Sequence, residues 1–118
     1  MGAPEMELSI DAGEHAGWRV VIVTGEIDLY TAPTLRDALG SAVEGGADRV
    51  AVDLRPVGFM DSMGLGVLIG SRRRLTERGG AFALICEEGP VRRVLDVSGL
   101  TKVFDVVERP EDLPGAAS

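Results

Sequence analysis

The octapeptide FMDSMGLG, residues 59–66, places the hydroxyl of Ser62 between an apolar strand and a helix punctuated by glycine. A serine at the start of a helix has a side-chain oxygen that can accept a hydrogen bond from the first free backbone N–H groups. The same N–H groups, together with the helix macrodipole, can hold a phosphate. The octapeptide therefore predicts either an ordinary N-cap at Ser62 or a serine that carries a charge.

The rest of the chain alternates between strand and helix patterns. Apolar or alternating runs predict strands at 7–11, 18–24, 49–54, 81–86 and 103–107, with a hairpin at 12–17. Apolar residues at helical spacing predict one helix that begins after Thr31 and ends near Gly45, a second from Ser62 to Gly79, and a third from Pro90 to Ser98. Residues 25–31 and 57–64 are expected to be loops, and 110–113 a short helical turn.

The predicted order is β-β-α-β-α-β-α-β followed by a short helix. It indicates an α/β fold with a mixed sheet of about five strands, a parallel centre, an antiparallel N-terminal edge and about four helices. At 118 residues, the chain is expected to form a single domain, 1–118, with a short turn and a frayed end at 110–118. Since functional sites gather at the carboxyl ends of parallel strands, the two loops should place Asp28 near Asp61 and Ser62.

Composition argues against several classes of function. The net charge of −7 and the low aromatic content disfavour nucleic acid as a partner. No apolar run is long enough to span a membrane, and the N-terminus lacks the features of a signal peptide, so a cytoplasmic protein is expected. The single cysteine, Cys86, lies in an apolar run and is interpreted as a buried strand residue without a disulfide partner.

The residues offer little for catalysis. A serine nucleophile needs a base, and the only histidine, His15, is far from Ser62 in the sequence. The glycine spacing after Ser62 matches neither a dinucleotide fingerprint nor a phosphate loop, and no metal-ligand spacing is present. No cofactor is therefore expected, and a small nucleotide or serine hydrolase remains only a remote alternative.

One side of the second predicted helix is almost bare. Ser62, Gly66, Gly70 and Arg73 fall on that side at helical spacing. Glycine within a helix costs roughly 1 kcal/mol relative to alanine, so a compensating reason is expected. Either the helix packs tightly inside its own domain, or a partner approaches its exposed backbone, and the sequence leaves both explanations open.

Three motifs together resemble the anti-sigma factor antagonists of the STAS domain family. They are GEID at 25–28, VDL at 52–54 with FMDSMGLGVL at 59–68, and DVSGLTKVF at 96–104. The resemblance extends over nearly the whole chain, with the motifs in the family's order. It implies a STAS-type mixed sheet and a bacterial regulator of transcription.

The resemblance also implies a partner-switching mechanism. The unphosphorylated antagonist would bind an anti-sigma factor with serine kinase activity and free a sigma factor. Phosphorylation of Ser62 would reverse this until a phosphoserine phosphatase acts. The family pattern places acidic residues at Asp28 and Asp61, whereas Met63 departs from the Ser or Thr that many members have.

The expected partner-binding surface combines the family motif with the bare helix side. It comprises Asp28, Tyr30, Thr31, Asp61, Ser62, Met63, Gly64, Gly66, Val67, Gly70 and Arg73. A monomer or weak homodimer is expected, without a membrane or nucleic-acid partner. The alternative within the same family is a scaffold or adaptor whose partner binding does not depend on phosphorylation.

Overall fold

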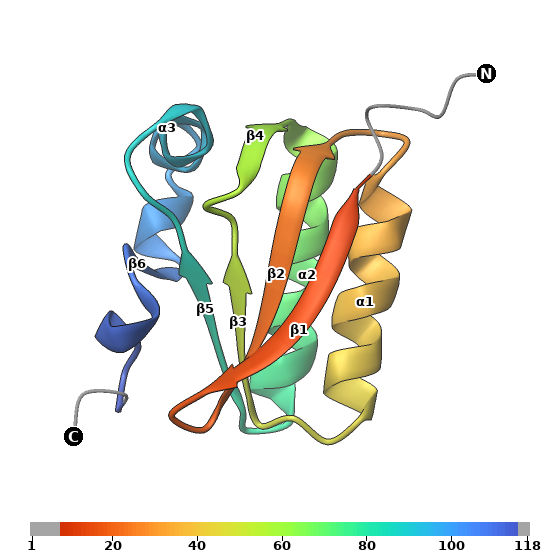
Figure 1. The fold of residues 1–118 in the computed structure, drawn as a ribbon, viewed down its shortest axis with the longest axis vertical. Coiled ribbons are helices and arrows are strands. Elements are labelled where there is room, and N and C mark those ends of the chain that lie inside the picture. The colour runs from red at the N-terminus through yellow and green to blue at the C-terminus, as the bar shows by residue number, and fades with distance from the viewer. Residues whose placement is uncertain (1–7, 116–118) are drawn as a thin grey trace.

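The computed structural model describes residues 8–115, which form a six-stranded mixed sheet with two long helices against one face (Figure 1). The main strand order is β1-β2-β3-β5-β6. These strands are β1 (Ser9–His15), β2 (Trp18–Ile27), β3 (Arg49–Asp53), β5 (Ala81–Ile85) and β6 (Asp105–Val107). Only β1 runs antiparallel to its neighbour, which confirms the predicted parallel centre and antiparallel N-terminal edge.

The helices are α1 (Ala32–Glu44), α2 (Ser62–Glu77) and α3 (Pro90–Val97). Figure 1 shows α1 and α2 side by side behind the sheet, with α3 at the end where β4 lies. Leu39 of α1 and Leu68 of α2 are fully buried in the main core together with Val52 of β3. Because these side chains pack together, α1 and α2 are held against the sheet, and the start of α2 is held near the carboxyl ends of the strands.

The first hairpin is tighter than the sequence suggested. We expected a turn over 12–17, but β1 continues to His15, which pairs with Trp18. Ala16 and Gly17 both have positive φ, at 50° and 88°. Two such residues form a turn whose twist matches the flanking strands, so the ladder continues up to the turn.

Strand β4 (Val57–Met60) corrects the expected loop at 57–64 and raises the strand count to six. It runs parallel to β2 beyond the end of β3, and Ile27 pairs with Met60. Pro56 and Gly58 interrupt the strand pattern in the sequence, which is why four residues of strand were missed.

The C-terminal segment packs against the second face of the sheet. The short helical turn predicted at 110–113 is a 3-10 turn at Pro110–Asp112, and Leu113 after it is buried against the second core cluster. The indole Nε1 of Trp18 donates a hydrogen bond of 3.0 Å to the carbonyl of Pro114. Residues 116–118, and the predicted strand start at Glu7, lie outside the described residues.

Candidate functional site

Asp61, not Ser62, caps helix α2. The backbone of Asp61 is extended, and its Oδ1 accepts a hydrogen bond of 2.9 Å from the N–H of Met63. Ser62 is the first helical residue, and its side chain is exposed. Its hydroxyl takes part in none of the hydrogen bonds within residues 8–115. The N-cap interpretation of Ser62 is therefore wrong, and its oxygen is available for other chemistry.

The carboxyl ends of β2 and β4 bring the two acidic segments together. The N–H of Asp61 donates a 3.1 Å hydrogen bond to the carbonyl of Ile27, the last residue of β2. Asp28 therefore follows directly after the residue to which Asp61 is bonded. This pairing confirms that the 25–31 segment and the start of α2 are neighbours.

Asp28 is occupied by the turn that leads into α1. Its Oδ1 accepts hydrogen bonds from the N–H groups of Tyr30 and Thr31, at 2.9 and 3.0 Å. The hydroxyl of Thr31 donates to the carbonyl of Glu26 at 2.7 Å and accepts from the N–H of Asp28. Thr31 occupies the predicted N-cap position, but its side chain does not cap α1 and is buried in this network. It shapes the turn and does not offer its hydroxyl to a partner.

A hollow of about 340 Å³ runs along α2 from Ser62 to Arg74, and Arg36 of α1 contributes to its wall. We call it the α1–α2 hollow. It is lined by Arg36, Ser62, Met63, Gly66, Val67, Gly70, Ser71 and Arg74. The expected partner surface thus contributes five of its residues to one concave site beside the Ser62 hydroxyl.

The glycines of α2 serve two different purposes. A Cβ at Gly64 would lie 2.6 Å from Cγ of Met60 and 2.7 Å from Cγ2 of Ile27, so α2 could not pack at this distance with any larger residue there. A Cβ at Gly66 or Gly70 would have nothing within 4 Å. The packing explanation therefore holds for Gly64, which is buried. Packing does not account for Gly66 and Gly70, which leave the hollow open.

Two arginines of the hollow were missed from the sequence. We expected Arg73, which is exposed but does not line the hollow; Arg74 does so instead. Arg74 pairs with Glu44 of α1 at 3.6 Å. Arg36 enters from α1, and only the helix-to-helix arrangement reveals which side of α1 faces α2. The apolar pattern of the sequence identifies Leu35 as a core residue, so Arg36 is expected next to the core. That pattern does not show that Arg36 lies on the same hollow as Ser62.

Large apolar side chains are exposed around the same end of the sheet. Tyr30 is 86% exposed, Leu29 57%, Phe59 48% and Met63 44%. They come from the segment after β2, from β4 and from the first turn of α2. Tyr30 and Met63 were expected from the sequence, whereas Leu29 and Phe59 were not. Exposed apolar residues gathered at one end of a molecule are typical of a protein-binding surface.

The histidine lies at the opposite end of β2 from Ser62. His15, the single histidine, pairs with Trp18 at the start of β2, whereas Ser62 follows the residues that pair with the end of β2. Within residues 8–115 no three histidine, cysteine or acidic side chains gather as a metal site would require. None of the helices described is long and apolar enough to cross a membrane.

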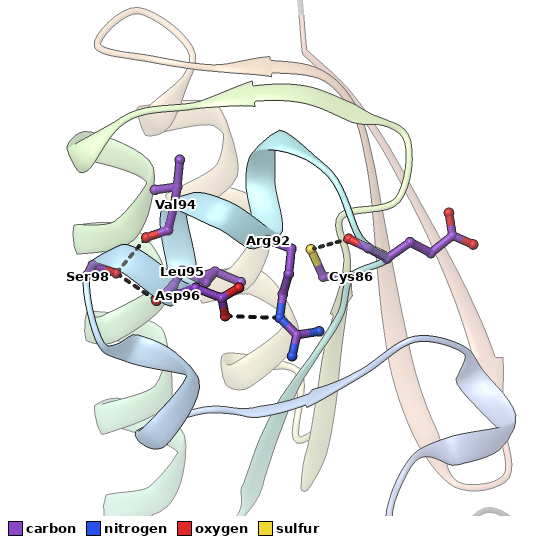
Figure 2. Close-up of polar contacts among 7 residues, drawn as sticks. Cys86, Arg92, Val94, Leu95, Asp96 and Ser98 are labelled. Atoms are coloured by element: carbon purple, nitrogen blue, oxygen red, sulfur yellow. Dashed lines mark hydrogen bonds and ion pairs between the residues drawn. The ribbon is translucent and has the colours of Figure 1, made fainter.

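Cys86 lies after β5 in a separate polar cluster around α3 (Figure 2). Burial raises the pKa of its thiol to about 11, so the thiol stays protonated near neutral pH. Arg92 pairs with Asp96 at 3.3 Å, and the Ser98 hydroxyl donates to the carbonyl of Val94 at 2.8 Å. The Ser98 hydrogen bond satisfies a carbonyl in the last turn of α3, and the Arg92–Asp96 pair links two turns of the same helix.

Asp53 is the one buried charged residue within residues 8–115. Asp53 is 3% exposed, and its carboxylate accepts hydrogen bonds from Nε and Nη2 of Arg55 at 2.9 and 2.7 Å. This contact raises the pKa of Arg55. The pair lies where the chain leaves β3 for β4, and it stabilises the break between the two strands.

Comparison with known proteins gives a consistent result. The STAS domain model matches residues 9–113. The anti-sigma-B factor antagonist of Bacillus subtilis (strain 168) is 34% identical over 106 residues, which cover 90% of this chain and 96% of that protein.

Solved structures agree with this match. The crystal structure of an anti-sigma factor antagonist from Mycobacterium paratuberculosis has a TM-score of 0.86 at 31% identity, and the match covers 100% of both chains. The anti-sigma factor antagonist SpoIIAA in its unphosphorylated form has a TM-score of 0.72 at 25% identity, covering 87% of this chain and 91% of SpoIIAA. The phosphorylated form of SpoIIAA from Bacillus has the same fold, with a TM-score of 0.67 at 23% identity over 90% and 97% of the two chains.

Proposed function

This chain belongs to the STAS domain family, and from that premise we propose that it is an anti-sigma factor antagonist. In its unphosphorylated form it binds an anti-sigma factor and so releases a sigma factor for transcription. The observation that carries the proposal is the Ser62 hydroxyl, which is exposed at the start of α2 and takes part in no hydrogen bond among the residues that the structure describes. It lies on the wall of the α1–α2 hollow.

The surface around Ser62 fits a protein partner. The hollow accepts a side chain of the anti-sigma factor because Gly66 and Gly70 leave it empty. The exposed Tyr30 and Met63 supply apolar area beside it. Burial of such side chains at an interface contributes most of the free energy of association. Asp28 and Asp61 face inward to their own turns and so hold these groups in place.

Phosphorylation of Ser62 switches the protein off. A serine kinase, the anti-sigma factor itself, transfers the γ-phosphoryl group of ATP to Oγ of Ser62 and releases ADP and a proton. The phosphate adds about −1.5 to −2 charge near pH 7, and a helix N-terminus tolerates it, so the fold is retained. The added bulk and charge act on binding, because they stand on the wall of the hollow next to Asp61.

The remaining features of the proposal follow from the same role. The protein is a regulatory binding module and not an enzyme, it needs no cofactor, and it acts in the bacterial cytoplasm. A phosphoserine phosphatase restores the active form. The antagonist itself is a monomer or a weak homodimer, since one molecule presents the complete surface.

Phosphate transfer from candidate anti-sigma kinases tests the proposal directly. The purified protein and its Ser62→Ala variant are incubated with each kinase and ATP, and the modified residue is mapped by mass spectrometry. We expect one phosphate on Ser62 and none on the variant. Partner binding that is the same for the wild type, Ser62→Ala and Ser62→Asp, without labelling of Ser62, would contradict the proposal and favour an adaptor that is not regulated by phosphorylation.

A further inference from the structure

Arg36 is the uncommitted cation of the α1–α2 hollow. It lines the hollow with Ser62, and its side chain is exposed. It takes part in none of the ion pairs or side-chain hydrogen bonds within residues 8–115. Arg74, the other basic residue of the hollow, is already paired with Glu44. A new negative charge in the hollow would therefore find Arg36 free.

Two of the residues on the α2 wall of the hollow have no side chain. Gly66 lies one turn after Ser62, Gly70 one turn further, and both line the same hollow. A Cβ at either position would meet no atom within 4 Å. The side chain of Arg36 from α1 and a phosphate on α2 therefore meet no side chain from these two positions.

The carboxylates near Ser62 would repel a phosphate on its hydroxyl, and a nearby cation would offset this repulsion. A phosphate on Ser62 stands next to the Asp61 carboxylate, which already accepts the N–H of Met63. Asp28 accepts the N–H groups of its own turn and is negative as well. Because like charges at short range repel, a phosphate here is stabilised by a guanidinium, which can donate two parallel hydrogen bonds to it.

Building on the proposed function, we infer that Arg36 binds the phosphate of phosphorylated Ser62 within the same molecule. The phosphate then lies at the Ser62 end of the α1–α2 hollow, beside the bare position of Gly66 one turn further along α2, and occupies space that the anti-sigma factor uses. Phosphorylation thus blocks the hollow in addition to changing its charge. Arg36 is thus a positioning residue. By holding the phosphate in the hollow, it further weakens the binding of the anti-sigma factor to the phosphorylated form.

Titration of the phosphate itself tests this inference. Phosphoserine is installed at position 62 during protein synthesis, and the full chain is titrated while its phosphorus NMR signal is followed. The second pKa of phosphoserine is ordinarily about 6. With Arg36 in contact we expect that pKa to fall by roughly one unit, because a nearby opposite charge favours the dianion. Asp28, Asp61, Glu44 and Arg74 also lie around the site, and they are the same in every variant compared.

Arg36→Gln and Arg73→Gln form a matched pair of variants. Both remove one exposed arginine from the surface formed by α1 and α2, but only Arg36 lines the hollow. We expect Arg36→Gln to restore the ordinary pKa, Arg36→Lys to keep part of the lowering, and Arg73→Gln to leave the wild-type value. Circular dichroism establishes that each variant is folded.

Equal phosphate pKa values in the wild type, Arg36→Gln and Arg73→Gln would overturn the inference. If Arg36→Gln and Arg73→Gln raised the phosphate pKa by the same amount, the inference would also be overturned. The pKa would then depend only on the overall charge of the surface and not on contact with Arg36. Because the phosphate is installed without a kinase, these outcomes are separate from the proposed function. That proposal is overturned by the kinase and partner-binding experiment and not by the titration.

Discussion

The two sides of helix α2 use the same residue type for opposite purposes. On the inner side, Gly64 is buried, and a Cβ there would overlap Met60 and Ile27. On the outer side, Gly66 and Gly70 meet no atom within 4 Å where a Cβ would be. The first glycine is required by the fold, while the other two cost helix stability and gain an open surface beside Ser62.

The contrast between these glycines separates the needs of the fold from those of the surface along one helix. Glycine in a helix interior lowers stability relative to alanine, so glycines that no packing contact requires call for another reason. Under the proposed function, that reason is access of the partner to the α1–α2 hollow, which both glycines line. Substitutions on the two sides of α2 should therefore have different effects on folding and on binding.

The largest expected effect is on folding, at the inner side. Gly64→Val should lower the free energy of unfolding by about 3 kcal/mol, because an overpacked core must shift backbone or side chains. Gly66→Val, the matched variant, should stay within about 0.5 kcal/mol of the wild type. Denaturation in urea measures both. Similar losses for the two variants would contradict the distinction between the two sides.

The next effect is on binding, at the outer side. Gly66→Leu should weaken the affinity for the anti-sigma factor by tenfold or more, which is roughly 1.4 kcal/mol, because its side chain fills the hollow. Gly13→Leu is the control, since its Cβ also meets nothing within 4 Å but lies on β1. Calorimetric titration gives both affinities. Equal affinities for the two variants would place the partner elsewhere.

A third effect is expected at the N-terminus of α2, where Asp61 caps the helix and Ser62 is its first residue. Asp61→Ala should cost about 1 kcal/mol of stability, since it removes the side-chain cap on the N–H of Met63. Ser62→Ala should change stability by less than about 0.5 kcal/mol, because the Ser62 hydroxyl makes no internal hydrogen bond. Thermal unfolding monitored by circular dichroism distinguishes them. A larger loss at Ser62 than at Asp61 would return the capping role to Ser62.

The smallest expected effect is a gain. Gly70→Ala should raise the free energy of unfolding by roughly 0.5 to 1 kcal/mol, because alanine favours the helix and its methyl group meets open space. The same urea denaturation measures it. A loss of stability here would show that Gly70 is packed in solution and would remove the main argument for an open hollow.

Much of the fold could be predicted from the sequence because it rests on local patterns. The apolar periodicity located α1, α2, α3 and the central strands, and the β-α order fixed the parallel centre. Strand β4 was missed because Pro56 and Gly58 interrupt the apolar pattern that is typical of a strand. The burial of Leu113 was missed because it depends on the distant Trp18 and not on its own neighbours.

The site was predictable only where it is contiguous in sequence. Ser62 and its motif stand out in the chain, but the choice of cap between Asp61 and Ser62 depends on backbone geometry that the sequence does not show. The separate roles of Gly64 and Gly66 depend on which side of α2 faces β4. Arg36 required knowledge of how α1 lies against α2.

The decisive measurement for Ser62 as a switch is the affinity of the anti-sigma factor for the phosphorylated and unphosphorylated forms of this protein. The protein carrying phosphoserine at position 62 is compared with the unphosphorylated protein by calorimetric titration under the same salt conditions. We predict at least a hundredfold weaker binding for the phosphorylated form, equivalent to roughly 2.7 kcal/mol. Affinities that agree within about twofold, for two folded proteins, would contradict the account of Ser62 as the switch.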